Sequence, residues 1–170
     1  MNYNFKKIGK SVKIFENVKI IKPEVIEIGD FSEIDDFTFI YGGKGIIIER
    51  YVHISRFVSI IGGGELFLGD YTVLADGARI LTGTDHYAGG YRMSTVLPME
   101  QRNPKVSYIR IEKDAFVGTN AIIHPGVTIG EGAIIGSNSL VLKDVKPWTI
   151  NVGSPVRVIG NRPKVKFEDI

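Results

Sequence analysis

The chain has 170 residues, contains no cysteine and carries a formal net charge of +2. This length fits one domain, residues 1–170, that buries about 70% of its unfolded surface, and the missing cysteines exclude disulfides and thiolate metal sites. The first residues hold no apolar run typical of a signal peptide, and no segment approaches the about 18 apolar residues of a membrane span, so we expect a cytoplasmic protein without membrane contact.

From residue 8 onward, an Ile, Leu or Val recurs every sixth residue, with two additional residues after every third repeat in the first half. The series comprises Ile8, Ile14, Ile20, Ile28, Ile34, Ile40, Ile48, Ile54, Ile60, Leu68, Leu74, Ile80, Ile111, Val117, Ile123, Ile129, Ile135 and Val141. A second, mostly small or β-branched series follows four positions later. A helix would repeat near 3.6 residues and a strand near 2, so a period of six indicates short strands separated by turns.

Three six-residue sides make one triangular coil, and coils stacked at about 4.8 Å build a continuous core. The sequence divides into coils at residues 8–27, 28–47, 48–67, from 68, 111–128 and 129–146. We therefore predict an all-β fold, a triangular parallel β-helix of about six coils. The additional residues near 26–27, 46–47 and 66–67 make the third side irregular, and we expect that side to face solvent or a partner.

The repeat stops between Ile80 and Ile111, which leaves a predicted loop of 25 residues at 86–110. Loops this long are usually functional or disordered. The side chains of Tyr87, Tyr91 and Arg92 could form an acceptor pocket, that is, a pocket for the molecule on which the protein acts.

His86 stands where the predicted loop leaves the coils, preceded by Asp85. An imidazole with an ordinary pKa near 6.5 suits a general base at neutral pH. Asp85 could orient the imidazole or bind the acceptor, although adjacent residues of an extended chain point to opposite sides. The alternatives are a surface histidine and a turn-forming aspartate.

The segment after the last coil, residues 147–170, is basic. Between residues 143 and 166 lie six basic residues and one acidic residue, a local net charge of +5. This charge suits a phosphate-bearing ligand or a solvated tail. The basic residues lack interleaved aromatic residues, which disfavours nucleic-acid binding. Trp148 is interpreted as a cap on the end of the prism.

Three motifs carry a family resemblance: IGEGAIIGSNS at 129–139, VLKDV at 141–145 and GSPVRVI at 153–159. They resemble the hexapeptide-repeat acyltransferases, above all the sugar O-acetyltransferases of the galactoside and polysaccharide kind. The resemblance implies a left-handed β-helix, a homotrimer and acetyl-CoA bound between subunits, with the catalytic histidine at the position of His86.

The resemblance also implies residues that bind the acetyl donor. Thr119 and Ser137 match turns that hold the pantetheine amides, and Lys143 and Arg157 match basic positions near the phosphates. Corner turns and solvated charges are the alternative interpretations of these residues. We assign structural roles to His53 and His124, and the histidine separations of 33 and 38 residues speak against a zinc site, so no metal is expected.

The predicted function is transfer of an acetyl group from acetyl-CoA to a sugar hydroxyl, by direct attack with His86 as the base. Without cysteine or a Ser-His-Asp pattern, no covalent enzyme intermediate is expected. Two alternatives remain: N-acetylation of a nucleotide-linked amino sugar, and a non-catalytic β-helix scaffold.

Overall fold

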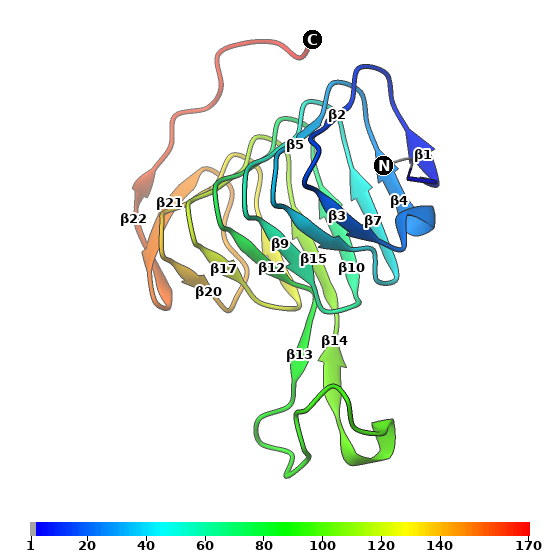
Figure 1. Ribbon diagram of the computed structural model, residues 1–170. Helices are drawn as coiled ribbons and strands as arrows, with labels where there is room; N and C mark the ends of the chain where they lie inside the picture. Colours follow the sequence, from blue (N-terminus) through cyan, green and yellow to red (C-terminus); the bar gives the residue numbers. More distant parts are fainter. Residues whose placement is uncertain (1–2) are drawn as a thin grey trace.

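The computed structural model describes residues 3–170, which form a prism of stacked coils with one projecting arm (Figure 1). The prism has three parallel sheets, called here the first, second and third faces. Within residues 3–170, no helix has the length and hydropathy needed to cross a membrane.

The first face contains β1 (Lys7–Ile8), β4 (Ile26–Ile28), β7 (Gly45–Ile48), β10 (Glu65–Leu68), β15 (Tyr108–Ile111) and β18 (Val127–Ile129). The second contains β2 (Lys13–Ile14), β5 (Glu33–Ile34), β8 (His53–Ile54), β11 (Val73–Leu74), β16 (Phe116–Val117), β19 (Ile134–Ile135), β21 (Thr149–Gly153) and β22 (Val156–Asn161). The third contains β3 (Lys19–Ile21), β6 (Phe39–Tyr41), β9 (Ser59–Ile61), β12 (Arg79–Leu81), β17 (Ile122–Ile123) and β20 (Leu140–Val141). Outside these faces lie β13 (Gly83–Asp85), β14 (Pro104–Val106), and the 3-10 helices η1 (Pro23–Val25) and η2 (Met99–Gln101).

The six-residue series forms the core, as the period predicted. Ile54 pairs with Leu74, which pairs with Val117, and all three side chains are fully buried. Polar members of the second series are also buried, because their hydroxyls bond the backbone; Thr38 donates to the Ser55 carbonyl at 3.0 Å. Ile8 departs from the prediction with 52% exposure, since no further coil covers the first one.

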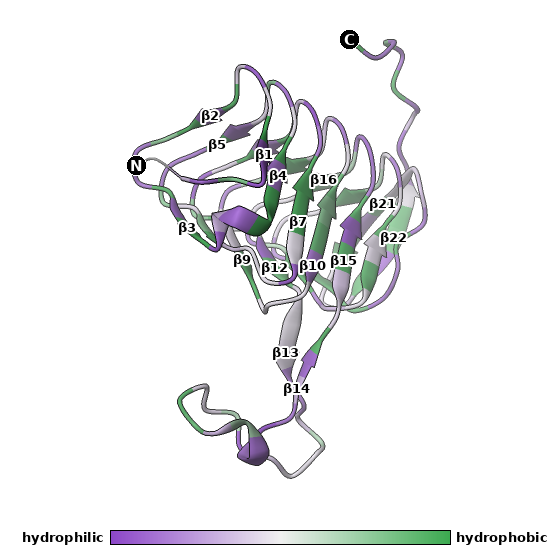
Figure 2. Cartoon of the chain, turned by 90° about the vertical axis from the view of Figure 1, so that its right-hand side faces the viewer, coloured by the Kyte–Doolittle hydropathy of each residue, from purple (hydrophilic) through white to green (hydrophobic). Residues whose placement is uncertain are grey.

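The predicted irregular side is confirmed only in part. The 3-10 helix η1 (Pro23–Val25) interrupts it in the first coil. The additional residues themselves lengthen strands of the first face, where Ile26, Ile46 and Leu66 are buried in regular parallel pairing. Ile47, which follows Ile46 in β7, points outward with 42% exposure. Figure 2 shows this face turned toward the viewer, with apolar colour on β7 and β10.

The corners carry an unusual row of residues with positive φ. The first corner joins the first and second faces, and it holds Phe31, Tyr51 and Tyr71 at φ of 60°, 58° and 61°. Left-handed backbone is strained for bulky residues. Stacking of the rings, at centroid distances of 5.0 and 5.2 Å, opposes that cost.

The second corner, between the second and third faces, repeats this construction. Phe37 and Phe57 stack there with centroids 5.2 Å apart. Gly77, Asn120 and Asn138 occupy the same position on the following coils, all at positive φ. Backbone hydrogen bonds link successive rungs, such as Gly77 N–H to the Arg56 carbonyl at 2.9 Å.

The C-terminal segment is more regular than predicted, because β21 adds a strand to the second face and β22 folds back on it antiparallel. Trp148 is the next rung of the first corner, where it packs directly over Gly132 at a place that any Cβ would obstruct, and it is not seen to cover the end of the core as predicted. Residues 162–170 return along the first corner, where Ile170 N–H donates to Tyr71 Oη at 2.9 Å. A hydrogen bond to Asp169 raises the pKa of Lys113 along this path.

Candidate active site

The arm leaves and rejoins the prism at the third corner, between the third and first faces. Its stem is the antiparallel pair β13 and β14, so the excursion spans residues 83–107 rather than the predicted 86–110. Tyr108 to Arg110 belong to β15, because Ile109 fills the buried position next to Leu66. His86 consequently lies at the far end of the stem and not where the chain leaves the coils.

Close backbone packing fixes the base of the arm. The Thr82 hydroxyl accepts a hydrogen bond from Gly64 N–H at 2.9 Å and donates to the Ile61 carbonyl at 3.0 Å. The Ser107 N–H donates to the Thr82 carbonyl at 2.8 Å. A Cβ on Gly64 would collide with the Ser107 carbonyl, so the two chain segments can meet only at a glycine.

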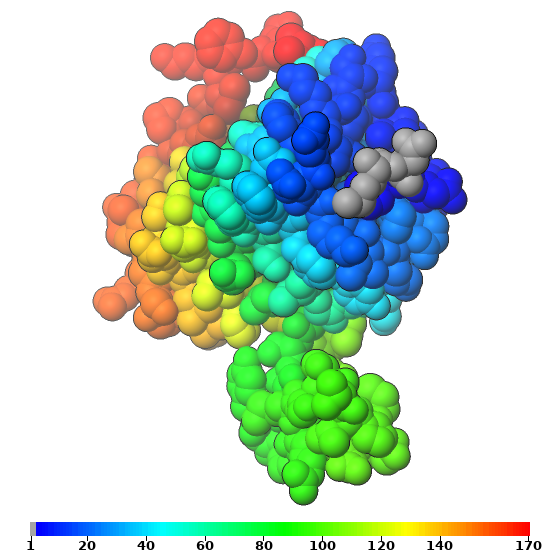
Figure 3. Space-filling view, viewed as in Figure 1, coloured from blue at the N-terminus to red at the C-terminus, as the bar shows by residue number. Residues whose placement is uncertain are grey.

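Beyond the stem, the arm forms a head, residues 86–103, that stands apart from the prism. Figure 3 shows it as a separate lobe on a narrow neck. Within the described chain, the hydrogen bonds and ion pairs of the head stay inside the arm, as between Arg92 N–H and the Gln101 carbonyl at 3.0 Å. Val96 and Met99 are nevertheless 89% and 62% exposed, which fits a surface that contacts another molecule.

Asp85 and Arg102 form a pair where the stem meets the head, and together with His86, which follows Asp85 in the chain, they are called here the polar cluster. Arg102 Nη2 lies 3.6 Å from Asp85 Oδ1, and the two side chains are only 12% and 25% exposed. Three of the cluster's atoms are buried without a hydrogen-bond partner among the described residues: Asp85 Oδ1, His86 Nδ1 and Arg102 Nε. Such atoms cost free energy unless a ligand or partner satisfies them, so the cluster has the character of a binding site.

Sequence reasoning missed Arg102. The antiparallel register places Pro104 opposite Asp85, and this brings Arg102 back to the carboxylate. Only the hairpin stem supplies that proximity, and a long loop of unknown shape gives no sequence signal for it. Asp85 thus faces Arg102, and no hydrogen bond joins it to His86 in the described structure.

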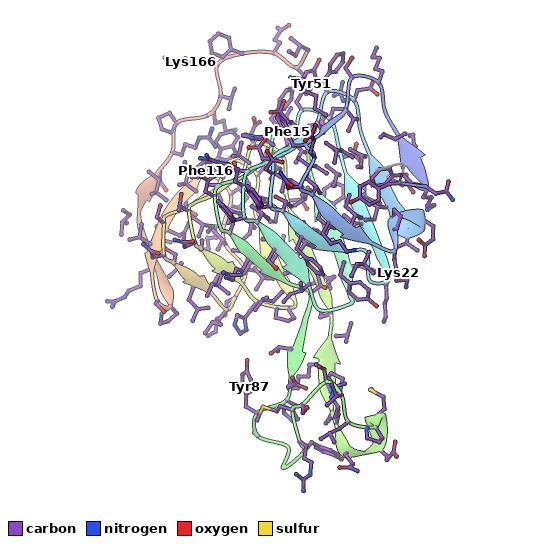
Figure 4. The ribbon with its side chains drawn as sticks, in the orientation of Figure 1. Phe15, Lys22, Tyr51, Tyr87, Phe116 and Lys166 are labelled. Carbon is purple, nitrogen blue, oxygen red and sulfur yellow. The ribbon has the colours of Figure 1, made fainter. Side chains whose placement is uncertain are left out.

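The predicted acceptor residues are spread over the head. Gly89 separates Tyr91 from His86, since a Cβ there would lie 3.0 Å from the Tyr91 ring and 2.9 Å from His86 Nδ1. Tyr87 is 67% exposed, and its hydroxyl bonds Thr84 Oγ1 at 3.0 Å. Figure 4 places Tyr87 on the arm, well outside the prism, and Arg92 is also exposed.

Three of the four predicted donor residues share the second corner near the C-terminal end. Asn138 N–H donates to the Thr119 carbonyl at 2.8 Å, which places Thr119 and Ser137 on successive coils, both exposed. Arg157 pairs with Val152, whose side chain lies against Gly136.

The fourth donor residue and the arm lie elsewhere. Lys143 follows β20 and stands at the third corner, beside Asp144, which accepts from Thr128 N–H at 2.7 Å. The arm also leaves from that corner, whereas Thr119 and Ser137 lie across the third face. A single chain therefore does not bring His86 to the second corner.

The other histidines lie outside the arm. His53 Nε2 lies 3.1 Å from Asp35 Oδ2 on the second face, and Glu33 completes a group of possible metal ligands within 4.8 Å of one another. Lys13 already pairs with Glu33 at 3.1 Å. His124 follows β17, and its N–H donates to the Val141 carbonyl at 3.0 Å as part of the coil.

Comparison with known proteins identifies the family. The model of the bacterial transferase hexapeptide (six repeats) matches residues 108–143. The dTDP-4-amino-4,6-dideoxy-D-glucose acyltransferase of Escherichia coli is 36% identical over 165 residues, 96% of this chain and 86% of the relative. The chain belongs to the hexapeptide-repeat acyltransferases.

Solved structures of this family show the same architecture. AntD, an N-acyltransferase from Bacillus cereus, is 32% identical, and an AntD variant in complex with dTDP-4-amino-4,6-dideoxyglucose and coenzyme A superposes with a TM-score of 0.90 over 94% of this chain and 85% of its own.

A further relative is similar by sequence. The putative colanic acid biosynthesis acetyltransferase WcaF of Escherichia coli is 26% identical over 156 residues, 92% of this chain and 69% of the relative. The predicted left-handed β-helix and acyltransferase family are confirmed.

Proposed function

We propose that this acyltransferase moves an acyl group from an acyl-CoA to the amino group of a nucleotide-linked amino sugar. The similarity that carries the proposal extends over the arm as well as the prism: two relatives that match more than nine-tenths of the chain act on or bind a dTDP-linked 4-amino sugar. This favours the N-acetylation alternative over transfer to a sugar hydroxyl. Hydroxyl transfer is kept as a second candidate, because the chain is also similar to WcaF, whose name gives an acetyltransferase of colanic acid biosynthesis and no amino sugar.

In the proposed reaction, the amine attacks the thioester carbonyl directly. The new C–N bond forms, the C–S bond breaks, coenzyme A leaves as the thiol, and the nitrogen gives up one proton. His86 is the proposed acceptor of that proton through its Nε2, because its Nδ1 is enclosed in the head and cannot reach a bound amine. Asp85 and Arg102 are proposed to position the imidazole and the acceptor.

Thr119 and Ser137 are the proposed contacts of the pantetheine arm, and acetyl-CoA is the proposed donor. Their exposed turns are one coil apart, about 4.8 Å, so an extended chain with two amides can bond a ladder of them. The proposed partners of the phosphates are Arg157, near the same corner, and Lys143, at the third corner. The chemistry requires no metal and no covalent enzyme intermediate.

A homotrimer is the proposed assembly, in which the arm of one copy reaches the second corner of the next. The separation of His86 from Thr119 within one chain supports this arrangement, as do the exposed apolar side chains of a head bonded only within itself. A cytoplasmic location is proposed with it, in agreement with a chain that lacks cysteine.

Thiol release from acetyl-CoA tests the proposal. With dTDP-4-amino-4,6-dideoxyglucose as acceptor, we expect release that depends on the acceptor, and an amide product by mass spectrometry. Release that occurs only with sugars lacking an amino group would replace the proposed acceptor by a hydroxyl.

A further inference from the structure

The aromatic pair at the second corner ends in an open ring face. Phe37 and Phe57 are each 56% exposed, and their rings are almost parallel, with an interplanar angle of 8°. The next rung is Gly77, which has no side chain. The face of Phe57 turned toward Gly77 is therefore left without the ring that a continued ladder would place there.

The first corner shows that open faces are not a general consequence of this fold. Its ladder of Phe31, Tyr51 and Tyr71 is capped at both ends by cations: Lys10 Nζ lies 5.5 Å from the Phe31 centroid, and Lys113 Nζ lies 5.8 Å from that of Tyr71. In residues 3–170, no cation or further ring lies over Phe37 or Phe57. Two ladders of the same construction thus differ in whether their ends are covered.

Polar groups border the space between the Phe57 ring and the Asn120 carboxamide, where Gly77 has no side chain; this space is called here the gap. The Asn120 carboxamide reaches over the backbone of Gly77, where its Oδ1 occupies the space that a Cβ would need. Beside the rungs, Arg56 Nη2 pairs with Asp76 Oδ2 at 2.8 Å. The gap has an apolar ring as its floor and amide and charged groups at its edge. This combination suits a nucleobase, which stacks through its face and forms hydrogen bonds through its edge.

The gap is in line with the proposed donor residues. Gly77, Asn120 and Asn138 are successive rungs of one corner, so Phe57 lies two coils, about 10 Å, below the rung that follows Thr119. A base linked through ribose and pyrophosphate to a sugar spans a separation of this order. The adenine of coenzyme A is expected at the other end, near Arg157 and β22.

We propose that the gap between Phe57 and Gly77 binds the nucleobase of the nucleotide-linked acceptor by stacking on the Phe57 ring. The proposal rests on the acceptor class proposed above and assigns its base to a site. Phe57 and Gly77 then determine affinity for the nucleotide part of the acceptor, while the arm acts on the sugar.

Two variants test the site from opposite directions. Phe57→Asn removes the ring but keeps a residue that tolerates positive φ. Gly77→Asn keeps the ring and fills the gap, continuing the Asn120 and Asn138 rungs; the flexible end of Asn120 must move aside. Phe31→Asn is the matched control, because it removes a stacked ring of equal backbone conformation from the capped ladder.

The experiment measures equilibrium binding of dTDP and of coenzyme A to the full chain by calorimetry. We expect both second-corner variants to weaken dTDP binding about tenfold and to leave coenzyme A binding within about twofold, with the control unchanged for both ligands. Unaltered dTDP binding by Phe57→Asn would overturn the site. Selective loss of coenzyme A binding would overturn it as well, since the ring would then belong to the donor's adenine.

Two further outcomes separate this proposal from the proposed function. Wild-type protein that binds coenzyme A but neither dTDP nor UDP would overturn the acceptor class and the site together. Normal acylation of the amino sugar with unaltered dTDP binding in both variants would overturn the site alone. A change in the oligomeric mass of Phe57→Asn would also overturn it, because the pair would then be a contact between copies.

Discussion

At the scale of single residues, the proposed chemistry depends on the His86 imidazole. Its Nδ1 is buried in the head, beside Gly89, and no group of the described chain satisfies it. The neighbouring Asp85 faces Arg102 instead. With Nδ1 enclosed, Nε2 is the ring nitrogen that remains to take a proton from a bound amine.

His86→Asn is predicted to lower kcat for an amino acceptor by about 100-fold at pH 7, and raising the pH to about 9 is predicted to restore part of the loss. The reason is that a free amine forms without a base as the pH rises, whereas a sugar hydroxyl stays protonated. The measurement is a pH profile of thiol release for both proteins.

His53→Asn is the control for this profile, because His53 pairs with Asp35 on the second face, outside the arm. Equal kcat in His86→Asn and wild type at pH 7 would show that His86 does not accept the proton.

The sequence predicts single residues well where chemistry alone selects them. His86 and Asp85 stand out because imidazole and carboxylate at the edge of a long loop are candidates in any fold. Arg102 does not stand out, because its approach to Asp85 depends on the antiparallel register of β13 and β14, which pairs residues far apart in the chain.

At the scale of elements, the arm and the prism are separately bonded structures. The stem ends at the pair of Asp85 and Pro104, which lie directly opposite each other, and Pro104 has no N–H with which to close a tight two-residue turn. The base of the arm is fixed through Thr82 and Ser107, both outside the head. The head can therefore be removed without breaking any hydrogen bond of the prism.

Replacing residues 86–103 by a short flexible Gly-Ser linker is predicted to leave the circular dichroism spectrum of the prism intact and to abolish acyl transfer. The expected loss of activity follows from removal of His86 and Arg102 together. Measurable transfer by this shortened protein would show that the arm holds no essential group.

The prism itself depends on its buried aliphatic column. Leu74→Ala is predicted to lower the free energy of unfolding by about 2–5 kcal/mol, because Leu74 is fully buried between Ile54 and Val117 and its loss leaves a cavity. Denaturant titration measures the change. Ile47→Ala is the matched control, since its side chain is 42% exposed, and an equal loss there would contradict a core confined to the inward series.

The repeat predicts these elements because inward positions of short strands must be apolar in every coil. It fails at the first face for a physical reason. Two additional residues lengthen β7 and β10, and one of the two points into the core while the other points outward. Counting residues alone cannot distinguish such a longer regular strand from an irregular turn. The bounds of the arm shift for the same reason, because Ile109 continues this longer strand on the next coil.

At the scale of the whole molecule, the proposed site is divided between two regions that one chain keeps apart. The arm leaves the third corner, and Thr119 and Ser137 lie at the second. An assembly in which each arm serves a neighbouring copy unites them. It also covers the exposed side chains of Val96 and Met99.

Mixed oligomers are predicted to recover activity from two inactive proteins. One carries the shortened arm, and the other carries Ser137→Trp, which blocks the exposed turn with a bulky side chain. A neighbour's intact arm can then meet an intact second corner. The measurement is thiol release after the two are refolded together, with each refolded alone as control; absence of recovery would confine each site to one chain.

The most direct test compares two nucleotide-linked sugars that differ only in an amino or a hydroxyl group at the same carbon. Each is incubated with acetyl-CoA and the protein, and thiol release is followed in parallel. The account predicts rapid release with the amino sugar and an amide product, with release from the hydroxyl analogue close to the rate without acceptor. Faster release with the hydroxyl sugar would contradict the proposed N-acyltransferase.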